Sequence, residues 1–254
     1  MMDNSVKRGI LLSDDNRLCI LLNEEDHIRI QAMEAGFDLD ECFEMANKVD
    51  DFMEETLDYA FDKQIGYLTC CPTNAGTGMR ASVMVHLPAL TMTGTINRVI
   101  DSLAQLGITV RGIFGEGSKA TGNLYQISNQ LTLGAAETDI LEKFKQIVGE
   151  VVEKEREIRG RLYQKDRYQL EDRLMRSYGV LRYAVKLSSE EAMKRLSDVR
   201  MAVELGIVKD TTLERLNSLI YEILPANIMK DYNLTDAAER DLKRAEIVRE
   251  RMCV

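Results

Sequence analysis

Hydrophobic and polar positions alternate in short stretches through the first half of the chain, which predicts β-strands. Two strands are expected at residues 17–22 and 27–33, joined by the acidic turn Asn23-Glu24-Glu25-Asp26. In the second strand Ile28 and Ile30 point to one face, and Arg29 points to the other. Further strands are expected at residues 67–69, 81–87, 108–114 and 124–130.

Helical periodicity separates these strands and then replaces them. It predicts helices at residues 39–61, at 89–106 with Gly107 just beyond the end, and at about 137–163. After about residue 160 only helical patterns remain, with breaks near Ser188, at 206–212 and at Pro225. The pattern therefore predicts a mixed strand-and-helix domain followed by a helical one, with the boundary at 155–165 along the long helix.

The composition is that of an ordinary globular chain. Of the 254 residues, 45% are hydrophobic and 30% are charged. No apolar run is long enough to cross a bilayer, and the first fifteen residues lack the apolar core of a signal peptide. A cytoplasmic location is the expectation.

The cysteines and histidines narrow the class of site. The five cysteines form no C-x-x-C pair, and the two histidines lie far apart in sequence. This argues against a zinc site, and the odd cysteine count argues against a disulfide framework. We expect free thiols and no metal held by protein ligands alone.

Charge is unevenly distributed along the chain. The whole chain has 33 basic and 42 acidic side chains, and residues 151–254 hold 21 and 19 of them. Residues 1–150 therefore hold 12 basic and 23 acidic side chains. An acidic half is a poor general nucleic-acid binder, and its few arginines become conspicuous.

Three segments of the acidic half each place an arginine on or beside a predicted strand. They are NEEDHIRIQ at 23–31, the loop CPTNAGTGMRASVMVHLP at 71–88, and RGIFGEGSKATGNLYQISNQ at 111–130. Their arginines are Arg29, Arg80 and Arg111. A guanidinium group can donate two parallel hydrogen bonds to phosphate oxygens and stays charged, so three such groups suit a polyphosphate.

Taken one at a time, these segments have simpler interpretations. A strand arginine is more often a surface or ion-paired residue, Cys71 can be a buried small hydrophobe, and the glycines after Phe114 can form only a hairpin loop. Neither of the two common nucleotide-binding glycine motifs occurs.

Together the three segments resemble the phosphagen (guanido) kinase family, and most closely its bacterial branch, the protein arginine kinases. YLTCCPTNAGTG, LEDRLMRSYGVL and RLSDVRMAVELGI are also similar to that branch. The resemblance implies an α+β fold in which helices flank an antiparallel sheet, followed by an all-helical domain. It places a partial catalytic domain at 9–158 and the helical domain at 159–254.

The resemblance also implies an activity, transfer of the ATP γ-phosphate to arginine side chains of proteins, which marks them for regulated degradation in the stress response. Glu25, Glu116 and Cys71 would be catalytic: the two glutamates would grip and orient the acceptor guanidinium and act as base, and Cys71 would assist electrostatically beside it. The implied ATP-binding residues are Arg29, Arg80, Ala81, Ser82, Val83, Met84, Arg111, Gly112, Ile113, Phe114, Gly115 and Glu116. Mg²⁺ would be bound through ATP.

The helical part carries a second motif of that branch. Arg240, Asp241 and Arg244 match an RDxxRA pattern, which the resemblance assigns to an allosteric phosphoarginine pocket. Arg240 and Arg244 are four residues apart and share a helix face. Without the family context this would be an ordinary charged helix face.

The resemblance further implies partners and one missing part. The partners are protein substrates with exposed arginine, a zinc-binding activator protein, a heat-shock repressor, a Clp-type unfoldase and a second copy of the chain. Nucleic acid and membrane are not expected as direct partners. Family members begin with an additional segment carrying an S-S-R-x-R stretch, and no such stretch occurs here. We expect the chain to start within the family's catalytic domain, which leaves its activity in isolation open.

Two other functions stay open at this point. One is a non-catalytic regulatory fragment that binds phosphoarginine or nucleotide. The other is a kinase of a small guanidino metabolite, against which the helical tail argues.

Overall fold

The structure, a computed structural model, describes residues 7–112 and 120–252. Its elements form two compact units, which we describe separately. The first unit comprises residues up to 83, 103–109 and 127–149, and the second comprises 84–102, 110–126 and the residues from 150 onward. Strands β6 (Ser82–His86), β7 (Ile108–Gly112) and β8 (Leu124–Asn129) contribute residues to both units, as do helices α3 (Ile96–Gln105) and α4 (Glu137–Lys165).

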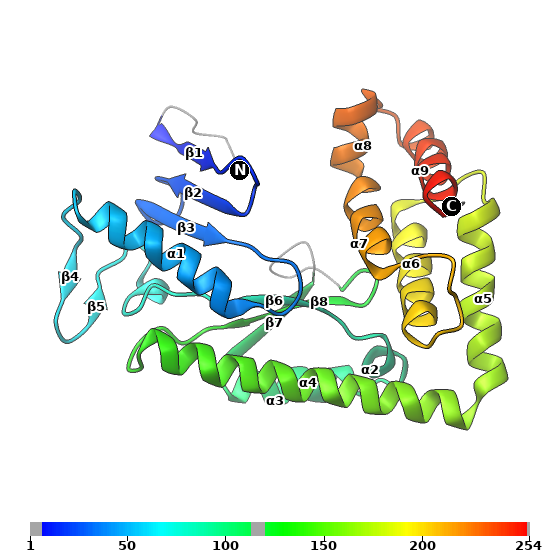
Figure 1. Cartoon of the computed structure of the whole chain (residues 1–254), viewed down its shortest axis with the longest axis horizontal. Helices are drawn as coiled ribbons and strands as arrows, with labels where there is room; N and C mark the ends of the chain where they lie inside the picture. Colours follow the sequence, from blue (N-terminus) through cyan, green and yellow to red (C-terminus); the bar gives the residue numbers. More distant parts are fainter. Residues whose placement is uncertain (1–6, 113–119, 253–254) are drawn as a thin grey trace. The chain divides into compact units, whose positions relative to one another are not determined.

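The first unit begins with an antiparallel sheet of β1 (Gly9–Leu12), β2 (Leu18–Leu22) and β3 (Ile28–Ala32). Ile20 pairs with Ile30 across β2 and β3, so the acidic turn between these strands is a hairpin end. Helix α1 (Leu39–Glu54) packs beside β3, as Figure 1 shows. Asp38 begins α1 by accepting a hydrogen bond from the Glu41 N–H.

The remaining strands form a small hairpin and a second sheet. The hairpin is β4 (Phe61–Asp62) with β5 (Gly66–Tyr67), and the sheet has the order β6 (Ser82–His86), β8 (Leu124–Asn129), β7 (Ile108–Gly112). The Asn129 N–H donates to the Ala81 carbonyl at one end of β8, and the Leu87 N–H donates to the Asn123 carbonyl at the other. Strands β6 and β8 therefore run antiparallel, and the expected antiparallel sheet flanked by helices is confirmed.

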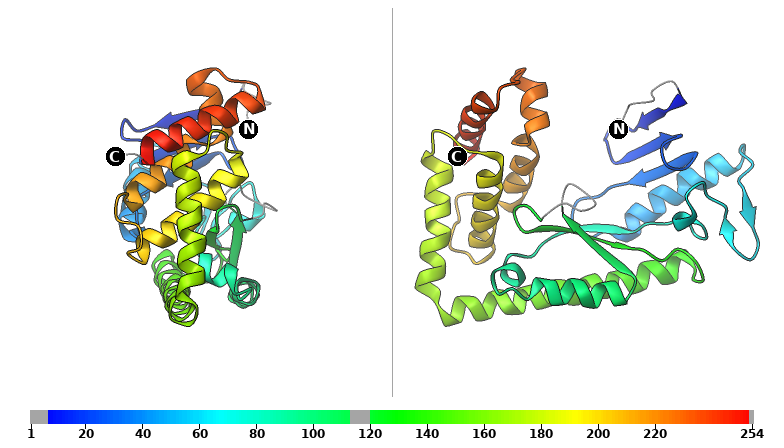
Figure 2. Two further views of the ribbon diagram at one scale, coloured as in Figure 1. Left: turned by 90° about the vertical axis from the view of Figure 1, so that its right-hand side faces the viewer. Right: turned by 180° about the vertical axis from the view of Figure 1, so that it is seen from behind.

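The second unit is mainly helical. Its helices include α2 (Pro88–Met92), α5 (Arg167–Tyr183), α6 (Ser189–Glu204), α7 (Leu213–Glu222), α8 (Pro225–Tyr232) and α9 (Ala237–Met252). Figure 2 shows α5 to α9 gathered into one bundle. Leu181, Leu196, Leu216 and Val248 lie in its buried apolar core. After β8 the described residues hold only helices among their regular elements, as predicted.

Two helix predictions are wrong. The helix expected at 39–61 ends at Glu54, and Phe61 belongs to β4. The helix expected at 89–106 is two helices, α2 and α3 (Ile96–Gln105), because Gly94 takes a left-handed φ of 66° between them. In both places apolar spacing continued beyond the turn that ends the helix. Helix α4 (Glu137–Lys165) runs without a break, as expected.

None of the helices in the described ranges combines the length and apolarity needed to cross a membrane.

Candidate active site

Asp26 holds the loop that carries Cys71. Its Oδ1 accepts a hydrogen bond from the Cys71 N–H at 3.0 Å, and its Oδ2 accepts one from the side-chain amide of Asn74 at 2.7 Å. Burial opposes ionisation of this carboxyl, but the hydrogen bonds from the loop outweigh it, so the pKa of Asp26 lies below its ordinary value. Glu25 is the neighbour of Asp26, so these bonds bring the acidic hairpin turn to the Cys71 loop.

Thr132 holds the same loop from another side. Its hydroxyl donates to the carbonyls of Thr73 and Ala75, at 3.2 and 2.8 Å, and its own carbonyl accepts the Thr77 N–H. Gly76 is required between them, because it has a φ of 105° and a Cβ there would lie 2.3 Å from the Thr132 carbonyl oxygen. The half-buried Cys71 thiol, 3.0 Å from the Thr73 hydroxyl, therefore sits on a fixed backbone.

Arg29 lies beside both glutamates of the hairpin turn. Its Nη1 is 2.5 Å from a Glu24 carboxylate oxygen and 3.4 Å from a Glu25 carboxylate oxygen. Arg29 and Glu24 are partly buried, whereas Glu25 is exposed. A predicted phosphate-binding guanidinium and a predicted catalytic carboxylate therefore occupy one place, at the end of the β2–β3 hairpin.

Arg80 is exposed just before β6, and buried residues of β8 fix its position. The guanidinium donates to the hydroxyl of Ser128 at 2.9 Å. The next residue, Ala81, donates its N–H to Asn129 Oδ1 at 2.7 Å, while the Asn129 amide donates to the main-chain carbonyls of Met79 and Leu131. This network holds the backbone on both sides of Arg80.

Asp26, Ser128, Asn129 and Thr132 were not singled out from the sequence. Asp26 stands inside the acidic turn, where it looked like one of three equivalent carboxylates. Ser128 and Asn129 lie near the end of the strand predicted at 124–130, and the pattern gave no indication that both are buried. Their roles depend on contacts 45 to 59 residues away in the chain, where no local pattern can reveal them.

The other predicted ATP-binding residues follow the strands. Ser82, Val83 and Met84 lie on β6, and Arg111 and Gly112 end β7. Arg111 is half-buried and belongs to the second unit. Ile113, Phe114, Gly115 and Glu116 lie outside the described residues. Within those residues no group of three His, Cys, Asp or Glu side chains could hold a metal ion.

The predicted phosphoarginine-binding residues lie on α9, and they differ sharply in burial. Arg244 is 1% exposed and donates to the carbonyls of Ile223 and Leu187, at 3.0 and 2.9 Å, and to Asp241 at 2.6 Å. Ile223 is the C-cap of α7, so Arg244 provides a hydrogen-bond donor for a carbonyl at the end of that helix. Arg240 is half-buried and donates to the carbonyl of Thr235. Among the three, Arg244 has the most extensive structural bonding.

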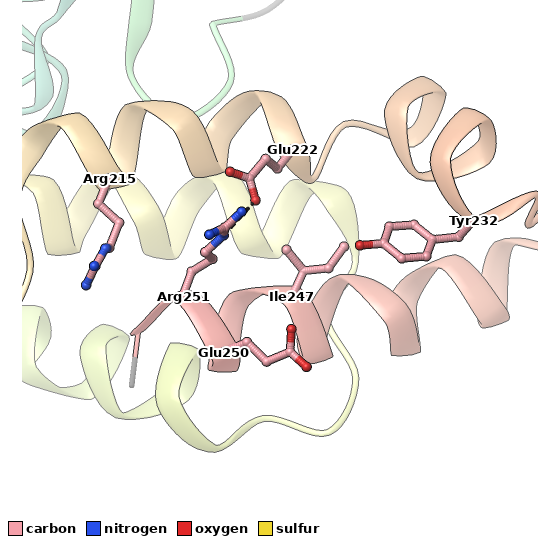
Figure 3. Close-up of a pocket in the computed structure, with 6 residues that line it drawn as sticks. All are labelled: Arg215, Glu222, Tyr232, Ile247, Glu250 and Arg251. Atoms are coloured by element: carbon pink, nitrogen blue, oxygen red, sulfur yellow. Dashed lines mark hydrogen bonds and ion pairs between the residues drawn. The ribbon is translucent and has the colours of Figure 1, made fainter. Parts of the chain in front are cut away.

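A pocket of about 170 Å³ lies elsewhere on the same helices, and none of the predicted residues lines it. It is lined by Arg215, Glu222, Tyr232, Ile247, Glu250 and Arg251 (Figure 3). Arg251 forms an ion pair with Glu222 at 3.0 Å across it. Its charged side chains cancel one another, so it has no net preference for an anion.

Two family models match the chain. The model for the ATP:guanido phosphotransferase C-terminal catalytic domain matches residues 1–158, and the model for the protein-arginine kinase McsB C-terminal domain matches residues 167–254. The protein-arginine kinase of Clostridium kluyveri is 49% identical over 255 residues, which are 100% of this chain and 74% of that protein. The protein-arginine kinase of Bacillus subtilis is 50% identical over 246 residues, 96% of this chain and 68% of that protein.

Solved structures with a similar fold act on other guanidino compounds, by their names. The duplicated taurocyamine kinase of Schistosoma mansoni matches 61% of this chain and 20% of its own, with 28% identity and a TM-score of 0.53. Lombricine kinase matches 59% of this chain and 42% of its own, with 29% identity and a TM-score of 0.53. The matched part thus covers less than half of either solved structure.

Proposed function

The chain belongs to the ATP:guanido phosphotransferase family, in its protein-arginine kinase branch, and we propose that it transfers the γ-phosphate of ATP to arginine side chains of proteins. The observation that carries this proposal is the 3.4 Å contact between Arg29 Nη1 and a Glu25 carboxylate oxygen. It sets a group suited to phosphate beside one suited to a guanidinium, which is the arrangement that phosphoryl transfer to arginine needs.

The roles of the side chains follow from the reaction. A guanidinium nitrogen of the acceptor attacks the γ-phosphorus, a nitrogen–phosphorus bond forms, and the bond to the bridging oxygen of ADP breaks. The acceptor loses a proton, which Glu25 is placed to take, with Glu116 as the second carboxylate. Cys71, on its fixed loop, assists beside the acceptor.

ATP would be held mainly by guanidinium groups and main-chain N–H groups. Arg29, Arg80 and Arg111 neutralise phosphate charge as it shifts toward ADP. We propose that main-chain N–H groups of 81–84 and 112–115 also donate to ATP. These donors suit phosphate oxygens, and Mg²⁺ would be carried by the ATP phosphates.

We propose a regulatory role for the helical domain, with its boundary at 158/159. Arg240 and Asp241 would bind phosphoarginine there, with Arg244 shaping the site from inside. The partners we propose are protein substrates with exposed arginine, a zinc-binding activator, a heat-shock repressor, a Clp-type unfoldase and a second copy of the chain. The proposed location is the cytoplasm, where ATP is available.

Kinase activity on a small guanidino metabolite is the second candidate function. The similarity to taurocyamine and lombricine kinases favours it. The match of residues 167–254 to a domain named for protein-arginine kinases argues for a protein acceptor.

The test is incubation of the chain with Mg-ATP and casein, followed by detection of acid-labile phosphate on arginine by mass spectrometry. Glu25→Gln is the negative control, and free arginine is the competing acceptor. A parallel form of the chain is fused to the part of the Clostridium kluyveri protein that it does not match. Product on casein from either form supports the proposal. Preference for free arginine favours the metabolite kinase, and nucleotide or phosphoarginine binding without product from either form favours a regulatory fragment.

A further inference from the structure

One buried hydroxyl of helix α6 contacts two segments that follow the proposed ATP-binding residues. Ser197 is 4% exposed, and its Oγ lies 2.8 Å from His86 Nε2 and 2.7 Å from Asn123 Nδ2. His86 is the last residue of β6, and Asn123 directly precedes β8. All three residues belong to the second unit.

The histidine of this group is neutral and has one defined hydrogen bond. Burial, with Arg200 and Arg159 nearby, keeps the pKa of His86 well below its ordinary value. Its Nδ1 is buried and has no hydrogen-bond partner within the part of the chain that the structure describes. Since an unpaired buried N–H is rarer than an unpaired acceptor, the proton belongs on Nε2. Ser197 then accepts from both His86 and Asn123, filling both lone pairs of its oxygen.

The backbone around Asn123 is also fitted closely to α6. Asn123 has a left-handed φ of 55°, and its carbonyl accepts the Leu87 N–H at 2.9 Å. Gly122 has a φ of 64°, and a Cβ there would approach the Met193 carbonyl oxygen to 3.0 Å. Met193 and Ser197 are four residues apart, so one face of α6 receives both Gly122 and Asn123.

We propose that Ser197 is a positioning residue for ATP binding, through which α6 fixes the end of β6 and the segment that leads into β8. This inference rests on the proposed function, because its importance depends on ATP binding at residues 80–84 and 111–115. His86 lies two residues beyond Met84 on β6. A strand is stiffer than a loop, so a displacement of His86 also displaces Met84. A shift of α6 would therefore change the affinity for ATP.

A stabilising role alone would produce the same contacts, so the test needs a second buried serine. Ser177 on α5 is 0% exposed and donates to Asp198 at 2.7 Å, but within residues 7–112 and 120–252 it forms no hydrogen bond to β6 or to residues 122–123. Ser197→Ala and Ser177→Ala both remove a buried hydroxyl. Only the first leaves the donors of His86 and Asn123 without their acceptor.

The experiment measures Mg-ATP binding to the full chain by calorimetry, and hydrogen exchange of residues 82–87 and 120–126 by mass spectrometry. We expect Ser197→Ala to raise the Kd for Mg-ATP at least about fivefold and to speed exchange in both segments. Ser177→Ala should leave both unchanged, even at an equal or larger loss of thermal stability. Ser197→Thr, which keeps the hydroxyl, should restore most of the affinity.

A second variant guards against simple unfolding of Ser197→Ala. Asn123→Gly keeps the left-handed backbone accessible and removes one donor, and it should weaken Mg-ATP binding in the same direction. Unchanged Kd in both Ser197→Ala and Asn123→Gly, or an equal loss in Ser177→Ala, overturns the inference. Mg-ATP binding without arginine phosphorylation by either the wild-type chain or its fused form contradicts the proposed function alone, whereas absence of Mg-ATP binding in both forms contradicts both.

Discussion

Asp26 Oδ1 accepts a hydrogen bond from the Cys71 N–H at 3.0 Å, although 45 residues separate the two in the chain. The bond ties the turn that carries Glu25 to the loop that carries the thiol. It gives Asp26 a positioning role that neither its charge nor its place in a run of acidic residues reveals.

Asp26→Asn should lower the rate of arginine phosphorylation about tenfold, while leaving the Kd for Mg-ATP within about twofold. The amide oxygen can still accept from the Cys71 N–H. The amide NH2 group, however, faces the side-chain NH2 group of Asn74, and two donors cannot form a hydrogen bond, so the Cys71 loop shifts. The measurement is kcat and KM for the acceptor protein, and Asp15→Asn in the exposed turn at 13–17 is the matched control. Equal effects of the two variants would show that only the loss of an acidic residue matters.

Glu25 and Glu24 both contact Arg29, and substitution separates their roles. Glu25→Gln should lower the rate of transfer about 10²-fold or more, because the proton acceptor is lost, and should leave Mg-ATP binding nearly intact. Glu24→Gln removes the closer partner of Arg29 and should mainly change the KM for ATP. Single-turnover kinetics with both variants would reveal the split. A larger loss of the transfer rate in Glu24→Gln than in Glu25→Gln would show that Glu24, and not Glu25, is the base.

Arg244 and Arg240 should behave differently in spite of their common helix face. Arg244→Ala leaves the Ile223 and Leu187 carbonyls and the Asp241 carboxylate without their donor, so we expect a loss of about 3 kcal/mol in the free energy of unfolding. Arg240→Ala should cost under about 1 kcal/mol, because its side chain is only half-buried, but it should abolish phosphoarginine binding. Denaturant unfolding and calorimetric titration of phosphoarginine test both statements. Unaltered titration with Arg240→Ala would remove that residue from the proposed site.

His86 should make the stability of the folded chain depend on pH in the acidic range. Its pKa is lowered in the folded state, so below about pH 6.5 the unfolded chain binds a proton at His86 that the folded chain does not bind. As the pH decreases from there, the free energy of unfolding should decrease by up to about 1.4 kcal/mol per pH unit, until the folded-state pKa is reached.

The control for this prediction is the chain's other histidine. His86→Gln should flatten the pH dependence of unfolding between pH 6.5 and 5, whereas His27→Gln, at an exposed position, should leave it in place. If the free energy of unfolding of the wild type depended on pH in the same way as that of His86→Gln, His86 would be protonated as readily in the folded chain as in the unfolded chain.

Several elements followed from local pattern. The two strands around the acidic turn, the long helix from Glu137 and the breaks at Ser188 and Pro225 all depend on neighbouring residues, through alternation, periodicity and helix-starting residues. The family motifs gave the candidate residues in the same way, because each motif is contiguous. Helix ends were predicted less well: apolar spacing continued past Glu54 and across Gly94, where the backbone turns.

The sequence by itself determined which chemical groups are available: three arginines, two glutamates, one thiol and an arginine pair on a helix. Only the tertiary structure decided how they are held. Asp26 binds a loop 45 residues away, Ser128 binds Arg80 from 48 residues away, and Arg244 is buried in structural bonds while Arg240 is not. The physical reason is that the free energy of a buried hydrogen bond depends on desolvation and on a partner in the right place, and both are set by how distant segments pack.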